Sequence, residues 1–374
     1  MLNLEELRGI AATNPGGDYY VSLYLNVDPI TNPNGEYIIK VRNMLKETAE
    51  GLERQKPVFK KVKEDLELLE DYFTGQKPQF RKAICLITRK SGGFWKEYHL
   101  AMPVQSGIFV DTMPYLKPLF DLMDHYPRHL ILLLSKDEAR MFVVQMGEIL
   151  EYGEIRTPDV IGKHKKGGWF ALEQDRFERH TDFHVGLHLN EVVRQLSGFV
   201  EKQGISRIVI GGPQETLAMG REKLPSGLAG RIIGEFQAGM YETSRQILDR
   251  VQPIVSAYEG GRQNETVDEL VTRAHKNNQA VLGIEDVMLM SGEKKIMTLL
   301  VDPALKQDGY ACRNCGALAL GPQNCRWCGG GMYGVNYLID LLMQKTVENG
   351  GRVEVVPENE KLRNLGKIGA ILRY

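Results

Sequence analysis

The sequence has few cysteines and no long apolar run. Only 5 of its 374 residues are cysteine, which excludes a disulfide-rich miniprotein. No apolar segment approaches the roughly 20 residues of a membrane-spanning helix, and the longest run, HLILLLS at 129–135, has the length of a buried strand. The first ten residues are acidic and lack the basic start and apolar core of a signal peptide. We therefore expect a cytoplasmic protein with no membrane partner.

An excess of charge of one sign is also absent. Lys and Arg number 47 and Asp and Glu 48, which gives a net charge of −1. This balance excludes a globally basic nucleic-acid binder, although not a local basic patch, and we expect no DNA partner. The hydrophobic content of 43% and the charged content of 25% are ordinary for a globular protein. At roughly 100–200 residues per domain, the length allows two or three domains.

Hydrophobic periodicity predicts an α/β protein with three domains. Prolines punctuate 112–128, and a soft linker is expected at Pro253 and 260–266. These breaks place the domains at 1–128, 129–250 and 251–374.

In the first domain, alternation over 19–27 predicts a half-buried strand. Helical spacing predicts one helix over 36–52 and, after a proline, another over 62–73. The runs KAICLIT and EYHLAMPV, joined by the glycine turn SGGFW, predict two further strands. Cys85, in the first of these runs, is interpreted as a small buried hydrophobic residue.

The middle domain is predicted to begin with the strand LILLLS. A hairpin of ARMFVVQ and EILEYGEI follows, and then a helix through 189–200 that ends at Gly204, the strand RIVIGGP and a long helix over about 228–250. In the third domain, a helix from Val267, the strand IMTLLVD, the helix YLIDLLMQKTVENGG and the strand RVEVVP surround a cysteine cluster. The expected third domain is an α/β sandwich with a small insertion.

The cysteine cluster has the spacing of a metal site. Two C-x2-C turns lie nine residues apart and supply Cys312, Cys315, Cys325 and Cys328. Four thiolates at this spacing predict a closed, structural Zn²⁺ site, with an iron–sulfur or redox centre as the alternative.

Four residues next to these cysteines have expected roles. Gly316 and Gly329 are expected to present backbone N–H groups to the sulfurs. Arg313 and Arg326 either balance the charge of the thiolates or contact RNA phosphate.

A basic glycine loop is the most unusual segment of the chain. Lys163, His164, Lys165 and Lys166 precede Gly167 and Gly168, and no carboxylate lies between Ile161 and Phe170. Such a loop is suited to an RNA phosphate backbone, whereas the alternative is a solvated hairpin tip.

Three histidines follow the loop at intervals of four residues. His180, His184 and His188 suggest a metal site, but the stripe drifts by about 40° per step on a helix. His184 is expected on the solvent side and His188 at the edge of the apolar face, so we favour a polar or RNA-facing surface over a metal site.

Three features occur in an order that resembles the class I peptide-release-factor superfamily of eukaryotes and archaea, which includes Pelota. They are the basic Gly-Gly loop that leads into an Arg/His-rich helix, the third domain interrupted by a C-x2-C pair, and the terminal GKIGAILRY. The chain looks most like the divergent bacterial and archaeal release-factor-like branch, over about 129–374. The resemblance implies an RNase-H-like middle domain and a third domain like the kink-turn-binding ribosomal proteins, here with a zinc knuckle. Residues 1–128 contain no counterpart of the family's NIKS stop-codon motif.

The resemblance also implies a catalytic loop. The family's GGQ loop enters the ribosomal peptidyl-transferase centre, and the residue after the glycines helps to position water against the peptidyl-tRNA ester. Gly167 and Gly168 match these glycines, Trp169 stands at the Gln position, and Gln174 follows an apparent three-residue insertion. We expect Gly167, Gly168 and Gln174 to be the catalytic residues.

The segment that surrounds these residues is expected to contact RNA. The expected RNA-binding residues are Lys163, His164, Lys165, Lys166, Trp169, Arg176 and Arg179. Trp169 offers either a backbone N–H to the reaction or a ring that stacks on a base.

Three functions remain open on sequence grounds. The first is a release or rescue factor that cleaves peptidyl-tRNA, with the ribosome and tRNA as partners. The second is a Pelota-like binder that docks without cleaving, and the third is a zinc-stabilised scaffold. No Ser-His-Asp set, carboxylate pair or nucleotide-binding motif supports catalysis away from the ribosome. We favour the first function, and the sequence leaves a translational GTPase partner open.

Overall fold

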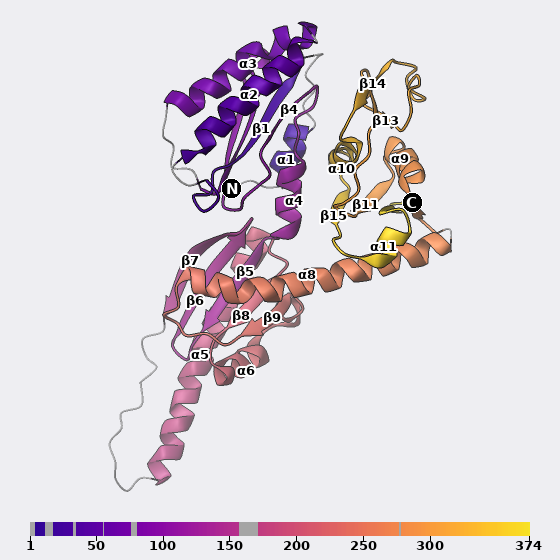
Figure 1. Cartoon of the computed structure of the whole chain (residues 1–374). Helices are drawn as coiled ribbons and strands as arrows, with labels where there is room; N and C mark the ends of the chain where they lie inside the picture. Colours follow the sequence, from indigo (N-terminus) through magenta and orange to yellow (C-terminus); the bar gives the residue numbers. More distant parts are fainter. Residues whose placement is uncertain are drawn as a thin grey trace. The chain divides into compact units, whose positions relative to one another are not determined.

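The computed structural model describes residues 4–11, 18–32, 35–54, 56–75, 81–156, 171–276 and 278–374, without the side chains of His125, Arg156 and 171–182. The chain forms two compact units, one of Met1–Asp124 with Arg262–Tyr374 and the other of His125–Gly261. The predicted mixed α/β architecture is confirmed, with four sheets in the described part of the chain (Figure 1). Among the described helices, none combines the length and the apolar character that crossing a bilayer requires.

The N-terminal part contains an antiparallel sheet with strand order β3-β2-β1-β4. Its strands are β1 (Tyr20–Asn26), β2 (Ala83–Arg89), β3 (Phe94–Leu100) and β4 (Gly107–Asp111), and its helices are α1 (Leu4–Ala11), α2 (Tyr37–Glu53), α3 (Lys56–Gly75) and α4 (Lys117–His125). The predicted turn SGGFW ends earlier than expected, because its aromatic residues already belong to β3. Apolar residues of α2 and α3 pack against β1 and β2 and form the core of this part.

The prediction that β1 is half-buried was wrong. Tyr20, Ser22 and Tyr24, which alternate with the core residues of β1, are at most 1% exposed. The segment after β4 covers this second face: the Tyr24 hydroxyl donates to the Tyr115 carbonyl at 2.6 Å, and the Tyr115 N–H donates to Ser22 Oγ at 3.0 Å. Because these polar groups have partners, the strand can be buried on both faces.

The unit His125–Gly261 contains a five-stranded sheet with order β7-β6-β5-β8-β9. Strands β5, β6 and β7 are antiparallel, whereas β5, β8 and β9 are parallel. The strands are β5 (His129–Leu134), β6 (Glu138–Gln145), β7 (Glu148–Arg156), β8 (Ile208–Gly211) and β9 (Ile232–Phe236). The predicted hairpin is confirmed, and its turn at Met146 and Gly147 has positive φ at both residues (50° and 77°), as a two-residue hairpin turn requires.

Helices cover both faces of this sheet. Apolar residues of α5 (Ala171–Gln203) and α6 (Gln214–Lys223) pack on one face, and those of α8 (Ser244–His275) pack on the other. Helix α5 ends before Gly204, whose φ of 62° stops the helix as predicted.

The predicted helix over 228–250 was wrong. This range contains the end of the four-residue helix α7 (Ser226–Ala229), the edge strand β9 and only the first residues of α8. Alternating burial is not visible in β9, where all five residues are half-buried. Because β9 has no fully buried face, its sequence lacks the alternation of apolar and polar residues that identifies a strand.

The predicted soft linker was also wrong. Helix α8 continues through Pro253, Gly260 and Gly261 to His275, and the break between the two units falls inside it, after Gly261. Ile247, Val251 and Val255 are fully or almost fully buried along one face, and this tertiary packing outweighs the poor helix propensity of proline and glycine.

The C-terminal part contains a four-stranded sheet with order β10-β16-β11-β15, in which only β11 and β15 are parallel. Its elements are β10 (Ala280–Leu282), α9 (Ile284–Gly292), β11 (Ile296–Val301), α10 (Leu338–Glu348), β15 (Arg352–Val355), α11 (Glu360–Asn364) and β16 (Ile368–Leu372). Helices α9 and α10 cover one face, while the end of α8 and α11 cover the other. A small antiparallel sheet of β12 (Gly309–Cys312), β13 (Leu318–Ala319) and β14 (Met332–Val335) is inserted between β11 and α10.

Candidate functional site

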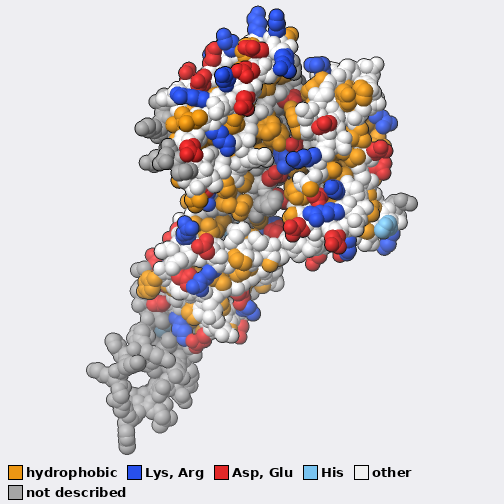
Figure 2. All heavy atoms as spheres, in the orientation of Figure 1, with side chains coloured by type: hydrophobic (Ala, Val, Ile, Leu, Met, Phe, Trp, Pro, Cys, Tyr) orange, Lys and Arg blue, Asp and Glu red, His pale blue; other side chains and the backbone are white. Residues whose placement is uncertain are grey.

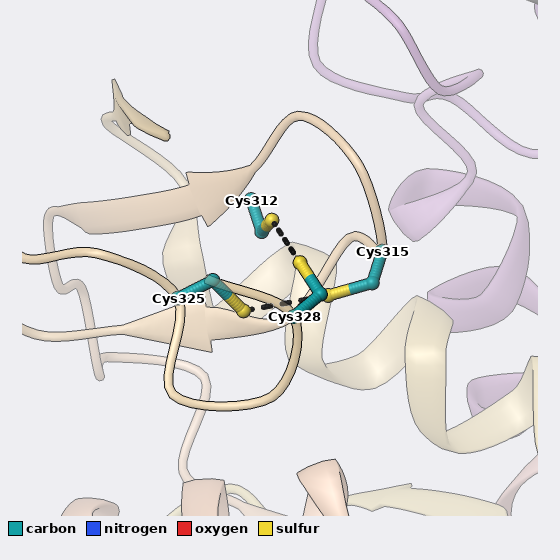
Figure 3. Close-up of side chains that lie close together, drawn as sticks. All are labelled: Cys312, Cys315, Cys325 and Cys328. Carbon is teal, nitrogen blue, oxygen red and sulfur yellow. Dashed lines mark hydrogen bonds between the residues drawn. The ribbon is translucent and has the colours of Figure 1, made fainter. Parts of the chain in front are cut away.

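The four cysteines of the inserted sheet lie together, as predicted. Cys312 ends β12 and Cys315 follows in the next turn, while Cys325 and Cys328 belong to a second turn before β14. Figure 3 shows the four sulfur atoms converging from the two turns. Cys312 and Cys325 are buried, whereas Cys315 and Cys328 face solvent.

The sulfur positions fit a four-thiolate metal site. The Sγ atoms of Cys312 and Cys328 are 3.4 Å apart, as are those of Cys315 and Cys325, and all four lie within 4.8 Å of one another. A disulfide would need about 2.05 Å. A tetrahedral site with Zn–S near 2.3 Å has sulfurs about 3.8 Å apart, which agrees with the observed range, so the four cysteines can hold a metal ion.

The backbone of the two turns supports the sulfurs, although not in the way that the sequence suggested. The N–H groups of Gly316 and Gly329 donate to the carbonyls of Cys312 and Cys325, at 3.0 and 2.7 Å, and not to sulfur. Positive φ values of 67° and 70° at these two glycines close the turns. The N–H groups that bond to sulfur belong to Asn314, Ala317 and Gly330, each two residues after a cysteine.

Two of the thiols, those of Cys315 and Cys328, differ in acidity. A hydrogen bond from the Gly330 backbone, and then hydrogen bonds with Cys312 and Cys315, lower the pKa of the Cys328 thiol to about 6. Burial raises the pKa of Cys315 to about 12. Four adjacent thiolates repel one another, and a bound cation removes this repulsion as the thiols release their protons.

Aromatic rings surround the two turns. The Arg313 guanidinium lies 4.9 Å from the centre of the Tyr333 ring, and that of Arg326 lies 5.6 Å from Trp327. The Trp327 ring covers Gly292 at the end of α9, where an added Cβ would lie 2.6 Å from the ring. This contact holds the second cysteine turn against the four-stranded sheet domain, and the sequence analysis missed it.

Gly330 is a second residue that the sequence analysis missed. An added Cβ there would lie 3.3 Å from Cys328 Sγ and 3.4 Å from Cys312 Sγ, which is closer than nine in ten Cβ contacts. The run Gly329-Gly330-Gly331 was the available signal, because consecutive glycines beside a ligand indicate close backbone approach.

The glycine loop cannot be placed in the same way. Seven residues of this loop lie outside the described part of the chain: Lys163, His164, Lys165, Lys166, Gly167, Gly168 and Trp169. Gln174, Arg176 and Arg179 belong to the first turns of α5, but their side chains are outside the description.

Helix α5 is firmly attached to the sheet beyond these residues. Five of its apolar residues recur at intervals of three or four positions and are at most 1% exposed. They are Val185, Leu189, Val192, Leu196 and Val200. This apolar face anchors the C-terminal part of the helix that begins just after the loop.

The histidine stripe is split between two environments. His184 is half-buried, but His188 is fully buried, and the prediction that it reaches only the edge of the apolar face was wrong. Burial lowers the pKa of His188, against the effect of a hydrogen bond with the Glu138 backbone. Among the described residues, the only group of three or more metal-binding side chains is the cysteine cluster.

Cys85 is a core residue, as predicted. Its side chain is fully buried in β2, and burial raises the pKa of its thiol to about 12. A thiol of this kind stays protonated and unreactive at neutral pH.

Comparison with solved structures finds distant similarity over most of the chain. The archaeal translation termination factor aRF1 is 15% identical, with 99% of this chain and 96% of that chain covered and a TM-score of 0.27. Pelota of Archaeoglobus fulgidus is 19% identical, with 78% and 79% covered and a TM-score of 0.36. A model of ribosome-bound archaeal Pelota and ABCE1 is 17% identical, with 80% of each chain covered and a TM-score of 0.42.

Comparison with curated proteins finds no match. Among protein families, residues 114–255 match bacterial archaeo-eukaryotic release factor family 10. This segment includes the glycine loop, α5 and the five-stranded sheet. Over these residues, the match agrees with the resemblance that the order of the motifs predicted.

Proposed function

We propose that this protein is a ribosome-associated release or rescue factor that promotes hydrolysis of the peptidyl-tRNA ester. The observation that supports this most is the match of residues 114–255 to a release-factor family, because that segment contains Gly167 and Gly168. The reaction adds water across the ester, so that the peptide leaves as a carboxylic acid and the tRNA keeps its hydroxyl. The partners are the ribosome and tRNA, and the place of action is the cytoplasm.

The roles of the loop residues follow from their chemistry. Glycines allow a backbone to approach RNA closely and to adopt unusual φ and ψ values. The amide of Gln174 offers a donor and an acceptor that can position water, and a nearby N–H group can stabilise the oxyanion that develops on the ester. Lys163, Lys165 and Lys166 supply charge for RNA phosphates.

These three lysines act together with four more RNA-binding residues. These are His164, Trp169, Arg176 and Arg179. In this proposal they hold the loop against RNA, while Gly167, Gly168 and Gln174 take part in the reaction.

The domain organisation belongs to the same proposal. We place an N-terminal domain at 1–128, a middle domain at 129–250 and a C-terminal domain at 251–374. The sheet order β7-β6-β5-β8-β9, with three antiparallel strands followed by two parallel ones, supports an RNase-H-like middle domain. The C-terminal domain is proposed to resemble the kink-turn-binding ribosomal proteins.

The metal proposed for the cysteine cluster is Zn²⁺. The support is the chemistry of the donors, since four thiolates in two short turns are typical of structural zinc. A closed site of this kind leaves no position for a substrate. Its role is therefore to hold the inserted sheet in its fold.

A second candidate function is ribosome binding without cleavage. Trp169 in place of the family's Gln, together with the three inserted residues that precede Gln174, favours this alternative. Catalytic placement tolerates only about 1 Å, and three residues shift the chain by at least ~4.5 Å if helical.

Substitutions at two positions distinguish these functions on ribosomes that carry peptidyl-tRNA. Under the proposal, Gln174→Ala abolishes cleavage and leaves ribosome affinity intact, because a transition-state contact is removed. Trp169→Pro removes a backbone N–H that Trp169→Ala keeps. Wild-type rates in the Gln174→Ala variant would refute the role of Gln174, and binding of the wild type without cleavage would favour the second function.

A further inference from the structure

A buried polar contact joins the N-terminal and C-terminal parts of the chain. Met1–Asp124 and Arg262–Tyr374 form one compact unit, although the whole of the other unit separates them in the sequence. The surface in view in Figure 2 mixes charged side chains of both signs. The contact between the two parts is defined instead by specific buried hydrogen bonds.

Asp111, the last residue of β4, is the centre of this contact. It is only 6% exposed, and both of its carboxylate oxygens accept hydrogen bonds from the C-terminal part. Tyr333 donates its hydroxyl to Oδ1 at 2.9 Å, and Tyr337 donates its hydroxyl to Oδ2. Burial, and then the charge of Asp111, raise the pKa values of both tyrosines, so they stay protonated. The buried carboxylate depends on these donors, because an unsatisfied charge away from water is costly.

The two donors are held in different ways. Tyr337 immediately precedes α10 and packs on the core of the four-stranded sheet domain. Tyr333 lies in β14 of the small inserted sheet, where it pairs with Ala311, the neighbour of Cys312. The Arg313 guanidinium, between two of the cysteines, lies 4.9 Å from the centre of the Tyr333 ring. Only Tyr333 therefore belongs to the cysteine insertion.

The inserted sheet is small enough to need a metal for its order. Its strands β12, β13 and β14 have four, two and four residues, which is shorter than the five or six residues of a typical strand. In such inserts the free energy of metal binding contributes to folding. A cation held by the two cysteine turns thus fixes the position of β14, and with it the position of Tyr333.

We propose that Asp111 couples the cysteine site to the N-terminal part of the chain. Metal loading places Tyr333 on Asp111, and this hydrogen bond in turn tightens the hold of the cysteines on the metal. Such coupling is reciprocal, because two events that favour each other do so by the same factor. Tyr333 and Asp111 are 222 positions apart in the sequence, so the N-terminal part controls a metal affinity to which it contributes no ligand. The inference goes beyond peptidyl-tRNA hydrolysis and rests on the metal proposed for the cysteine cluster.

Other contacts hold the two parts together without the insertion. The Tyr115 hydroxyl donates to Asp340 Oδ2 at 2.7 Å, and the Val355 N–H donates to Asp124 Oδ2 at 3.0 Å. Because these contacts remain when the inserted sheet loses its order, loss of the metal does not separate the parts. Metal affinity is therefore a more sensitive readout of the coupling than the shape of the molecule.

The test measures the zinc affinity of the full chain by competition with a chromophoric chelator under reducing conditions. Tyr333→Phe keeps the ring and removes the donor, while Asp111→Asn keeps the shape of the acceptor and removes its charge. The double variant closes a cycle of the two changes. The matched control is Tyr310→Phe, because Tyr310 lies in the same small sheet and donates no hydrogen bond to the described residues of the N-terminal part.

The proposal gives a defined outcome for each variant. Tyr333→Phe should bind zinc about tenfold more weakly, since a hydrogen bond to a buried charge is lost. Asp111→Asn should bind zinc about threefold more weakly or worse, because a neutral acceptor forms a weaker bond. The double variant should be at most about twofold weaker than Tyr333→Phe, because both changes remove the same bond. Tyr310→Phe should bind zinc like the wild type.

Equal zinc affinity of the wild type and Asp111→Asn would overturn the proposal, because Tyr333 would then act only within its own sheet. Losses that simply add in the double variant would overturn it as well. A wild type that binds no zinc would overturn the metal site together with the coupling. The proposed function fails on a different readout, because absence of peptidyl-tRNA cleavage leaves all these zinc affinities unchanged.

Discussion

Two glycines in the middle of α8 offer a test of how the helix is held. Gly260 and Gly261 have helical backbone angles, and a Cβ added at either position would meet nothing within 4 Å. Neither is needed for a turn or a close approach, and both lie where the two compact units divide. We therefore expect Gly260→Ala/Gly261→Ala to be accepted without a clash and to stiffen the helix.

The magnitude follows from helix propensity. Alanine is about 1 kcal/mol more favourable than glycine in a helix interior, so the double variant should gain about 2 kcal/mol against local opening. At about 1.4 kcal/mol per factor of ten, hydrogen exchange in the α8 amides around residue 260 should slow about 5-fold for one substitution and about 30-fold for both. Local exchange is the right measurement, because a chain of two units has no single unfolding transition.

The matched control is Ala257→Gly, at an exposed position one turn earlier in α8. It should speed the same exchange about 5-fold. If the alanine variants exchange as fast as the wild type, or faster, then the glycines make packing contacts that the structure does not contain, and the reasoning is refuted.

Three further predictions concern the cysteine site and the middle unit. Cys315→Ser should lose the bound zinc, as measured by elemental analysis. The variant should become disordered over 309–335, while the amides in the rest of the chain stay protected from hydrogen exchange. Global unfolding of the variant would contradict this prediction. Gly330→Val should crowd two sulfurs and lower zinc affinity at least tenfold in chelator competition, whereas unchanged affinity would refute the contact. Burial holds the pKa values of His129 and His188 below their ordinary 6.5, so folding favours the neutral rings. Stability of this unit should be full above pH 6.5 and fall below it, by up to about 1.4 kcal/mol per pH unit for each ring. The urea midpoint should therefore drop between pH 7.5 and 5.5, and drop less in His129→Gln/His188→Gln.

Strands and helices with a clear period were predictable from the sequence. The hairpin at Met146 and Gly147, the α5 stop at Gly204 and the buried Cys85 were all confirmed. In each case a local rule decides the outcome: φ > 0 at a turn, a left-handed residue at a helix end, or a short apolar run.

The errors arose where tertiary contacts outweigh local preference. Helix α8 passes through Pro253 and two glycines because its buried face packs on a sheet that is distant in sequence. His188 was expected at the edge of the apolar face when the stripe was extrapolated from His180, but it is buried where α5 meets the β6 strand through Glu138. Sequence spacing alone does not reveal such partners.

The cysteine site was predictable in its ligands but not in its support. Paired C-x2-C spacing specifies four sulfurs, whereas the amide donors Asn314, Ala317 and Gly330 depend on how each turn closes. The contact of the Trp327 ring with Gly292 involves helix α9, and the two residues are 35 positions apart in the sequence. No local pattern encodes that contact.

The central claim is that the Gly167-Gly168 loop promotes hydrolysis of peptidyl-tRNA on the ribosome. The most direct measurement is single-turnover release of a labelled nascent peptide from purified stalled ribosomes, with the wild type and with Gly167→Ala/Gly168→Ala, while ribosome binding is followed by pelleting. We predict that both proteins bind and that only the wild type releases peptide. Release by the double variant at the wild-type rate, or binding of the wild type without any release, would contradict the claim.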